Sequence, residues 1–441
     1  MRRLYTAGLS LYLLARLPGF VLEGSRGKHD LPRRLREGFL GPLPGAVRPN
    51  SRPSIWVHAC SLGEVLAARP LLEGLRTRFP RERLVLSTVT RTGFDIAAAR
   101  LRDSLDGLFY FPFDLPWAVR RALERVRPGV VVIVETEIWP NFLTECYRRG
   151  VAVVWVNGRI SDRAFSRYRW AAPLLSPLLA RASLLIMRTE EDARRIRAMG
   201  APEGRVVVAG NLKYDRGEAE AAAREEATRR LGELLRLEDG AGPLIVAGST
   251  TEPEEAVVLA AFRLVRSRPG LTQARLLVAP RHPERFEQVA SQLEASGFRL
   301  ARRSRPVTGP ADVFLLDSIG ELAAAYGLAQ AVFVGGSVSR RGGQSILEPA
   351  ACARAAVVGP HMENFREVLA DFQRAGAVEQ LSTDEPASAA RELAAVWTRW
   401  LAHPEEARRM GERAREVILR HAGATQRTLS RLIPLIEERL S

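Results

Sequence analysis

Short runs of apolar, often β-branched residues alternate along the chain with stretches whose apolar residues recur every three or four positions. The first pattern is typical of buried strands and the second of helices packed along one side. Residues 65–78 and 253–266 are clear helical examples. This alternation predicts parallel sheets that are covered by helices on both faces. The predicted strands are 54–59, 84–89, 130–134, 152–156, 183–187, 206–209, 244–248, 275–279, 312–316, 331–335 and 355–358.

The middle of the chain contains a predicted boundary between two such α/β regions. Residues 215–240 are rich in Glu, Ala and Arg, which favours a helix, and a turn-forming Asp-Gly-Ala-Gly-Pro sequence ends at Pro243. A chain of 441 residues is also long enough for two cores. We therefore predict a Rossmann-like domain at 23–215, a linker at 216–242 and a second Rossmann-like domain at 243–441. The last helix of the second domain is able to pack back on the first.

The amino terminus is apolar from Leu4 to Ala15 and is then interrupted by Arg16 and by Pro18 with Gly19. It is shorter than the roughly 20 apolar residues that a membrane-spanning helix requires. The first 50 residues carry nine basic and three acidic side chains. This pattern favours an interfacial membrane-associating segment at residues 1–22, with the main body on the cytoplasmic side. The alternative is an apolar first helix that packs on its own domain.

The formal net charge of +15 raises the possibility of nucleic-acid binding. All but two of the 65 basic residues are arginine, however, and they are scattered among acidic residues without a long basic run. We attribute this skew to coding bias and predict no nucleic-acid partner. The three cysteines are far apart and form no C-x-x-C motif, which argues against a disulfide framework or a zinc site.

Three charged residues of the first half stand where ligands bind in open α/β sheets, beyond the carboxyl ends of strands. Glu64 follows the strand at 54–59, and its Ser61-x-x-Glu64 spacing is also that of a helix capping box. Glu135 ends the strand at 130–134, although it could instead be an ordinary ion-paired acid. Lys213 is one of only two lysines, which suggests that a compact ammonium is needed there, unless it is retained by chance.

The second half has three similar positions. Arg281 follows the strand at 275–279 and could hold a phosphate. The sequences Ser318-x-x-Glu321 and Ser345-x-x-Glu348 match helix starts, which can be simple caps or anion sites. The glycines around 335–343 either form tight turns or let the backbone approach a ligand closely. The absence of G-x-G-x-x-G after the first strand, and of a P-loop motif, argues against a dinucleotide site and P-loop chemistry.

Together these motifs resemble the lipid A Kdo transferases, which add 3-deoxy-D-manno-octulosonic acid (Kdo) to a lipid A precursor. The resemblance covers nearly the whole chain, and the order of the motifs is specific. They are S-L-G-E at 61–64, T-R-T-G at 90–93, F-P-F-D at 111–114, E-T-E-I-W-P-N at 135–141, N-G-R-I-S at 157–161, G-N-L-K-Y-D at 210–215, A-G-S-T at 247–250, P-R-H-P at 280–283, D-S-I-G-E-L at 317–322, L-E-P-A at 347–350 and G-P-H-M-E-N-F at 359–365.

The resemblance implies a GT-B fold of two doubly wound α/β domains with an interdomain cleft. It implies an inverting transferase of the cytoplasmic side of the cell inner membrane, which moves Kdo from CMP-Kdo to lipid IVA without a metal or other cofactor. Glu64 would be the general base, and Glu135 and Lys213 would stabilise the transition state. The residues implied to hold CMP are Pro280, Arg281, Ile319, Gly320, Glu321, Ser345, Ile346, Leu347 and Glu348.

The chain departs from the family in two places. Gln344 and Ser345 stand where the family has His and Asn, and Thr251 and Pro253 replace His and Gly in the G-S-T-H-x-G-E-E motif. The alternative is therefore a membrane-associated GT-B transferase that uses a different CMP- or UDP-activated sugar. The alternative from another functional class is a protein that binds at the membrane surface and has no catalytic activity.

Overall fold

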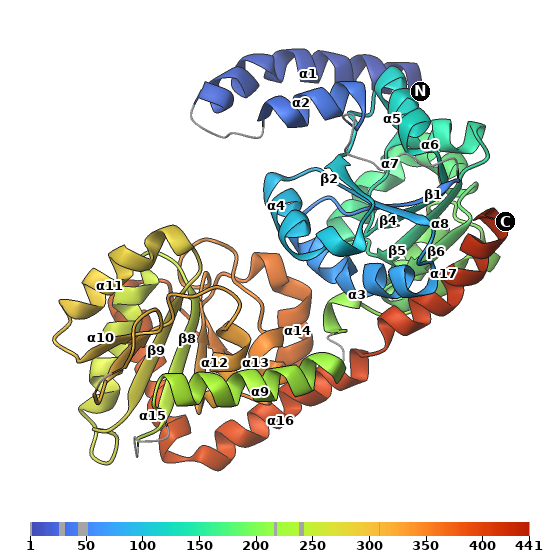
Figure 1. Ribbon diagram of the computed structural model, residues 1–441. Coiled ribbons are helices and arrows are strands. Elements are labelled where there is room, and N and C mark those ends of the chain that lie inside the picture. The colour runs from blue at the N-terminus through green and yellow to red at the C-terminus, as the bar shows by residue number, and fades with distance from the viewer. Residues whose placement is uncertain are drawn as a thin grey trace. The chain divides into compact units, whose positions relative to one another are not determined.

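The computed structural model describes residues 2–25, 31–42, 52–215, 218–237, 242–307 and 309–440. The chain forms two compact units (Figure 1). The first consists of Met1–Arg216 together with His421–Ser441, and the second of Gly217–Arg420. Each unit is a parallel sheet with helices, as the alternating pattern predicts.

The sheet of the first unit has seven strands in the order β3-β2-β1-β4-β5-β6-β7. The chain starts at the centre with β1, moves outward to β3 and then returns to β4 on the other side of β1. The point between β1 and β4 is therefore the topological switch point, where open α/β sheets bind ligands. The strands are β1 (Ser54–His58), β2 (Arg83–Thr88), β3 (Gly107–Tyr110), β4 (Pro128–Val134), β5 (Ala152–Gly158), β6 (Leu184–Met187) and β7 (Val206–Val208).

Helices cover both faces of this sheet because successive strand residues point to opposite sides. Ile55 and Val57 of β1 belong to one apolar cluster, and Trp56 between them belongs to the other. The last helix, α17, adds Leu432 and Ile436 to the first of these clusters and contacts α3 and β4. The helices are α1 (Arg2–Ser25), α2 (Leu31–Leu40), α3 (Leu62–Arg78), α4 (Arg91–Arg100), α5 (Pro116–Val126), α6 (Pro140–Arg148), α7 (Asp162–Leu179), α8 (Glu190–Ala198) and α17 (Ala424–Leu440).

One side of the first helix, α1, packs on the rest of the first unit. The Thr6 hydroxyl accepts a hydrogen bond of 3.0 Å from the side-chain amide of Asn141, and Leu13 is buried in a small apolar cluster. Leu4, Leu11 and Tyr12 are exposed on the same helix. None of the helices that the structure describes is long and apolar enough to cross a membrane.

The second unit repeats this plan with a seven-stranded sheet in the order β10-β11-β9-β8-β12-β13-β14. Its switch point lies between β8 and β12. Large buried side chains such as Phe262, Trp397 and Trp400 fill its core. Its strands are β8 (Leu244–Thr250), β9 (Arg275–Pro280), β10 (Leu300–Arg302), β11 (Val313–Leu315), β12 (Ala331–Val334), β13 (Ala356–Val358) and β14 (Glu379–Gln380). Its helices are α9 (Glu218–Leu234), α10 (Glu254–Arg266), α11 (Phe286–Glu294), α12 (Leu322–Leu328), α13 (Leu347–Ala351), α14 (Arg366–Arg374), α15 (Pro386–Ala402) and α16 (Pro404–His421).

The predicted fold class, α/β with two Rossmann-like doubly wound domains, is confirmed, and every predicted strand is found. The pattern misses β3, β10 and β14, which are short strands at the edges of the two sheets. The segment 216–242, predicted as a linker, contains α9. This helix contacts α12 and is part of the second unit.

Candidate active site

Glu64 lies just beyond β1, in the first turn of α3. The Ser61 hydroxyl donates a hydrogen bond of 2.9 Å to its Oε1, and the backbone N–H of Cys60 donates one of 2.7 Å to its Oε2. Ser61 is also the N-cap of the helix. The capping interpretation of Ser61-x-x-Glu64 is therefore correct for the local geometry, and it fixes the carboxylate at the switch point of the sheet.

Glu135 lies across the switch point, immediately after β4, with a backbone φ of +62°. Such left-handed backbone is uncommon outside glycine and tends to occur at functional sites. Its Oε1 lies 3.2 Å from the Lys213 ammonium and also contacts the Arg188 guanidinium. Burial alone would raise the pKa of Glu135, but Arg188 and Lys213 hold it below its usual value. Glu135 is therefore ionised at neutral pH.

Lys213 is held in place by two asparagines. Its own backbone N–H donates to the Asn211 side chain at 3.1 Å, and the N–H of Leu212 donates to the Asn157 side chain at 3.0 Å. Asn157 belongs to β5, so the short helical turn that carries Lys213 is tied directly to the sheet. The ammonium consequently reaches Glu135 from a fixed backbone.

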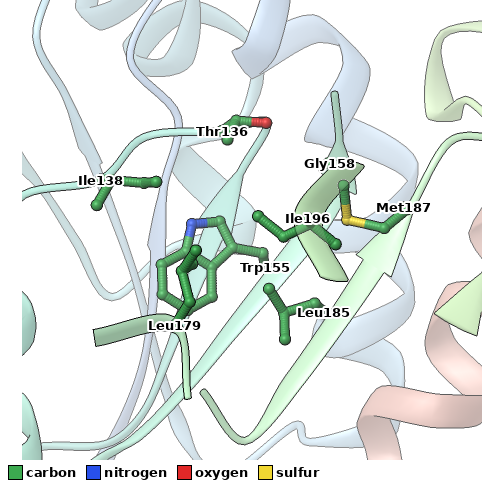
Figure 2. A pocket seen from close by; sticks show the side chains of 8 residues that line it. All are labelled: Thr136, Ile138, Trp155, Gly158, Leu179, Leu185, Met187 and Ile196. Carbon is green, nitrogen blue, oxygen red and sulfur yellow. The ribbon is translucent and has the colours of Figure 1, made fainter. Parts of the chain in front are cut away.

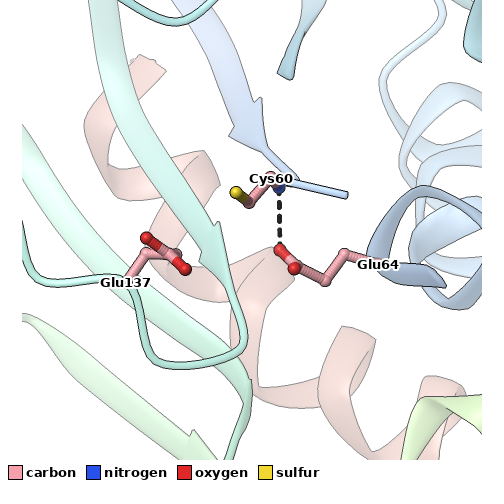
Figure 3. A group of neighbouring side chains, drawn as sticks. All are labelled: Cys60, Glu64 and Glu137. Carbon is pink, nitrogen blue, oxygen red and sulfur yellow. Dashed lines mark hydrogen bonds between the residues drawn. The ribbon is translucent and has the colours of Figure 1, made fainter. Parts of the chain in front are cut away.

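Glu137 brings a second carboxylate toward Glu64. Ligand atoms of Cys60, Glu64 and Glu137 all lie within 4.8 Å of one another (Figure 3). Burial, followed by the negative charge of Glu135, raises the pKa of Glu64 to about 7. The same two causes raise the pKa of Glu137. The site thus pairs one ionised carboxylate, Glu135, with a second, Glu64, that exchanges its proton near neutral pH.

The cluster of Cys60, Glu64 and Glu137 has the composition of a possible metal site. A cysteine binds a metal as its thiolate. Burial raises the pKa of the Cys60 thiol to about 12, so the thiol stays protonated at neutral pH. Glu64 also already accepts two hydrogen bonds. This donor set fits proton transfer better than the binding of a cation.

Thr136 and Ile138, the sequence neighbours of Glu137, line an apolar void beside Trp155 and Met187 (Figure 2). The void has no space for a water molecule. It is therefore part of the packed core under the acidic segment and not a substrate site.

Arg188 is the residue of this site that the sequence motifs miss. It follows β6, is 5% exposed, and donates from Nε to the Asn157 carbonyl at 3.1 Å in addition to pairing with Glu135. Its position just after a predicted strand was the only signal that could have identified it. Glu64, Glu135 and Lys213, all singled out in the sequence, are brought together within the first unit.

The residues expected to bind the nucleotide lie in the second unit, at the carboxyl ends of its strands or in the loops and the short helix that follow them. Pro280 ends β9, and the exposed Arg281 follows and donates its backbone N–H to the Thr250 carbonyl at 2.9 Å. Glu321 pairs with Arg303 at 3.0 Å, whereas Ile319 and Gly320 are exposed beside it.

The two expected capping boxes of the second unit are absent. Helix α12 begins at Leu322 with Glu321 as its N-cap, and the five-residue α13 begins at Leu347. Neither has a side-chain cap, because their serines lie too far upstream of the first helical residue. Ile346 and Leu347 are buried in the core, so only their backbone is available to a ligand. Ser345 and Glu348 are partly exposed.

Comparisons with known proteins agree on one family. A sequence model described as 3-Deoxy-D-manno-octulosonic-acid transferase (kdotransferase) matches residues 33–216. The 3-deoxy-D-manno-octulosonic acid transferase of Haemophilus influenzae is 34% identical over 87% of this chain and 87% of its own length. That of Bordetella pertussis is 35% identical over 90% of this chain and 89% of its own.

Among solved structures, the UDP-GlcNAc 2-epimerase of Neisseria meningitidis matches 86% of this chain and 100% of that chain, with a TM-score of 0.57. At 13% identity this likeness shows the fold alone. The fold, the matched family model and the two transferases lead to one conclusion: the chain belongs to the 3-deoxy-D-manno-octulosonic acid transferases, a family of glycosyltransferases.

Proposed function

We propose that this transferase moves Kdo from CMP-Kdo to a lipid A precursor, lipid IVA, with inversion at the anomeric carbon and with Glu64 as the general base. The observation that carries the proposal is the Glu64 carboxylate, fixed at the switch point of the first sheet with a pKa near 7. A general base is most effective when its pKa is close to the working pH.

The proposed reaction is a single displacement. Glu64 takes the proton from a hydroxyl of the acceptor as the hydroxyl oxygen forms a bond to the anomeric carbon of Kdo. The bond from that carbon to the phosphate oxygen breaks, and CMP leaves with the electron pair. Because the hydroxyl attacks from the face opposite the phosphate, the configuration is inverted.

Glu135 and Lys213 would stabilise the transition state. The Lys213 ammonium offsets the negative charge that develops on the departing phosphate, and Glu135 holds the ammonium at 3.2 Å. Glu135 also offers negative charge to the sugar carbon as its bond to phosphate lengthens. A half-buried pair of this kind needs no reorganisation during the reaction, since its backbone is already fixed.

The second unit would bind CMP-Kdo. Arg281 is exposed beyond β9 and suited to a phosphate, and Glu348 and Ser345 are suited to ribose hydroxyls or the base. Backbone groups of buried residues would complete the site. The full proposed set is Pro280, Arg281, Ile319, Gly320, Glu321, Ser345, Ile346, Leu347 and Glu348.

We propose that no metal or other cofactor takes part. The protonated Cys60 thiol and the hydrogen-bonded Glu64 support this proposal. Kdo transfer by the purified protein should be unchanged after dialysis against EDTA and in its continued presence. Loss of activity that returns with a single divalent cation would contradict a metal-free reaction.

The acceptor is a lipid, so we also propose that α1 contacts the cytoplasmic surface of the inner membrane. Its exposed Leu4, Leu11 and Tyr12 support this role. Replacing Leu4 and Leu11 with serine should reduce co-sedimentation with anionic vesicles, whereas substitution of the exposed Leu264 in the second unit should not. Equal binding by both variants would contradict the assignment.

The test of the whole proposal is a transfer assay. Purified protein in detergent receives CMP-Kdo, generated in place, and tetraacyl lipid IVA, and mass spectrometry reads the lipid product. Mass increments of whole Kdo units, lost in Glu64→Ala, are the expected result. Incubation with a panel of other CMP- and UDP-sugars tests the alternative donor that Gln344 and Ser345 suggest. Product with a UDP-sugar alone would overturn the proposed donor.

A further inference from the structure

Glu254, at the start of α10, occupies a cup of backbone N–H groups at the switch point of the second sheet. Four consecutive amides of the loop after β12 point at its carboxylate: Gly336 at 2.7 Å, Ser337 at 2.8 Å, Val338 at 2.8 Å and Ser339 at 3.2 Å. The amide of Thr251 adds a fifth bond of 2.9 Å. Glu254 is 0% exposed, so no water competes for these donors.

Gly335 and the Thr251 hydroxyl complete this arrangement. A Cβ on Gly335 would come within 2.8 Å of the Glu254 carboxylate and 2.6 Å of the Ser249 carbonyl, which explains why glycine is needed there. The Thr251 hydroxyl bonds Glu254 at 3.2 Å and the Ser339 hydroxyl at 2.6 Å. The loops after β8 and β12 are therefore joined through one carboxylate.

Ser337 extends the connection to the loop after β13. Its hydroxyl accepts a hydrogen bond of 2.8 Å from the amide of Gly359, and its carbonyl accepts one of 2.8 Å from the amide of His361. Three loops at the carboxyl edge of the sheet thus depend on the position of the 336–339 segment, which Glu254 sets.

The same segment positions the proposed donor loop. The amide of Gly343 donates to the Gly336 carbonyl at 2.7 Å, and Gly343 directly precedes Gln344 and Ser345. A carboxylate that receives several backbone N–H bonds in a buried setting forms strong, charge-assisted hydrogen bonds. Movement of the cup would therefore shift the start of the 345–348 segment.

We propose that Glu254 is a positioning residue for the sugar-nucleotide donor, and that it takes the place a donor phosphate would otherwise occupy in this backbone cup. The amides of 336–339 are then structural, and the donor phosphate is bound by side chains such as Arg281. This inference rests on the proposed function, because it assumes that the second unit binds CMP-Kdo.

The variants that test this role are Glu254→Gln, Glu254→Asp and the control Asp312→Asn. Glutamine keeps the size of the side chain but loses the charge. Its side-chain NH₂ group would also face the backbone N–H groups of the cup, which need an acceptor. Asp312 is a half-buried carboxylate bonded to Arg299 and Arg266. It directly precedes β11, however, and so lies at the amino edge of the sheet, away from the cup.

Full-length wild-type protein and each variant would be titrated with CMP by calorimetry. Backbone hydrogen exchange of Gly336 to Ser339 would be measured on the same samples. Glu254→Gln should weaken CMP binding on the order of 10- to 100-fold, since small displacements of a binding loop have effects of this size. It should also accelerate exchange at these four amides, while Glu254→Asp restores part of both. Asp312→Asn should lower the melting temperature without changing either quantity.

The outcomes separate the two proposals. Absence of CMP binding by the folded wild-type protein would refute the donor assignment itself. Normal CMP affinity in Glu254→Gln, with accelerated exchange at 336–339, would overturn the positioning role and leave the donor assignment intact. If Glu254→Gln does not fold, Glu254→Asp decides by the same two measurements.

Discussion

The two sheets of this transferase have the same kind of switch point but use it in opposite ways. In the first, between β1 and β4, Glu64 and Glu137 have raised pKa values and stand close together. In the second, between β8 and β12, the Glu254 carboxylate is saturated with backbone hydrogen bonds. The first arrangement is suited to exchange a proton and the second to hold loops still.

The difference lies in what surrounds each carboxylate. Glu64 accepts two hydrogen bonds and faces the ionised Glu135, so burial and repulsion outweigh the stabilisation of its charge. Glu254 accepts bonds from five backbone amides, which compensate for its burial. The two carboxylates therefore differ in how far hydrogen-bond donors compensate for their burial.

Replacing Glu64 with glutamine should have the largest effect of any single change. The amide oxygen can still accept the Cys60 bond, but the side chain can no longer take a proton. We expect kcat/KM for Kdo transfer to fall by about 10²- to 10⁴-fold, the usual contribution of a general base. Initial rates with CMP-Kdo and lipid IVA would measure this loss.

The matched control is Ser61→Ala, which removes the helix cap and leaves the carboxylate. It should cost about 1 kcal/mol of stability in thermal or urea unfolding. Because the Ser61 hydroxyl also donates to Glu64 and stabilises its ionised form, kcat/KM should fall at low pH but stay close to that of the wild type on the plateau at higher pH. If Ser61→Ala is as inactive as Glu64→Gln on this plateau, the role of Glu64 is that of a cap and the comparison of the two switch points fails.

Replacement of Lys213 is expected to cause the next largest loss of activity. Replacement with methionine removes the ammonium but leaves Glu135 paired with Arg188. The kcat at saturating CMP-Kdo should fall by about 10²- to 10³-fold, as for other groups that stabilise developing charge. Lys213→Arg should recover only part of this loss, because a planar guanidinium does not replace a compact ammonium.

An exposed cation on α8, Arg194, provides the control for charge alone. Arg194→Met changes the net charge by the same amount and should leave kcat unchanged. Full activity in Lys213→Met would contradict a role for the ammonium in the transition state.

The sequence predicts the parts of this molecule that depend on local pattern. Buried strands need unbroken apolar runs, so their ends, and with them the positions of Glu64, Glu135 and Arg281, can be read from the chain. Short edge strands such as β10 and β14 bury little, so they have no such run. The helix starts expected at Ser318 and Ser345 were wrong, since a capping spacing also occurs in loops.

The pattern of apolar and polar residues does not predict contacts between distant segments of the chain. Arg188 follows β6 and meets Glu135, 53 positions earlier at the end of β4, because these two strands lie on either side of β5 in the sheet. Glu254 meets the amide of Gly336 across 82 positions, and nothing in its local sequence distinguishes it from Glu255. Glu255 instead pairs with Arg285 at 2.8 Å. Both partners are set by strand order, which the pattern does not encode.

Replacement of Arg281 tests the proposed donor site of the second unit at a residue outside the Glu254 cup. Its side chain is exposed while its backbone is fixed by Thr250. Arg281→Ala should raise the KM for CMP-Kdo about tenfold or more, the equivalent of one charge-assisted hydrogen bond, with a smaller change in kcat. The exposed Arg268 is the control, and its alanine variant should behave as wild type. An unchanged KM in Arg281→Ala would exclude its side chain from phosphate binding.

The smallest expected effect is a shift in the pH dependence of kcat/KM. Glu64 acts as a base only when ionised, so kcat/KM should rise with pH through about 7 and then level off. Burial and Glu135 are the main causes of the raised pKa, and the charge of Glu137 adds to them. Glu137→Gln removes part of this repulsion, which favours the ionised form of Glu64.

The acid limb of the profile should therefore move to lower pH in Glu137→Gln, and the rate at pH 6 should increase relative to the plateau. Because the charge of Glu137 is the smallest of the causes that raise the pKa of Glu64, we expect a change of about twofold to fivefold, less than one pKa unit. Glu145→Gln, on α6 of the same unit, should leave the limb in place. A limb that moves to higher pH would show that Glu137 shares a proton with Glu64 and stabilises its ionised form, contrary to the repulsion argued for the first switch point.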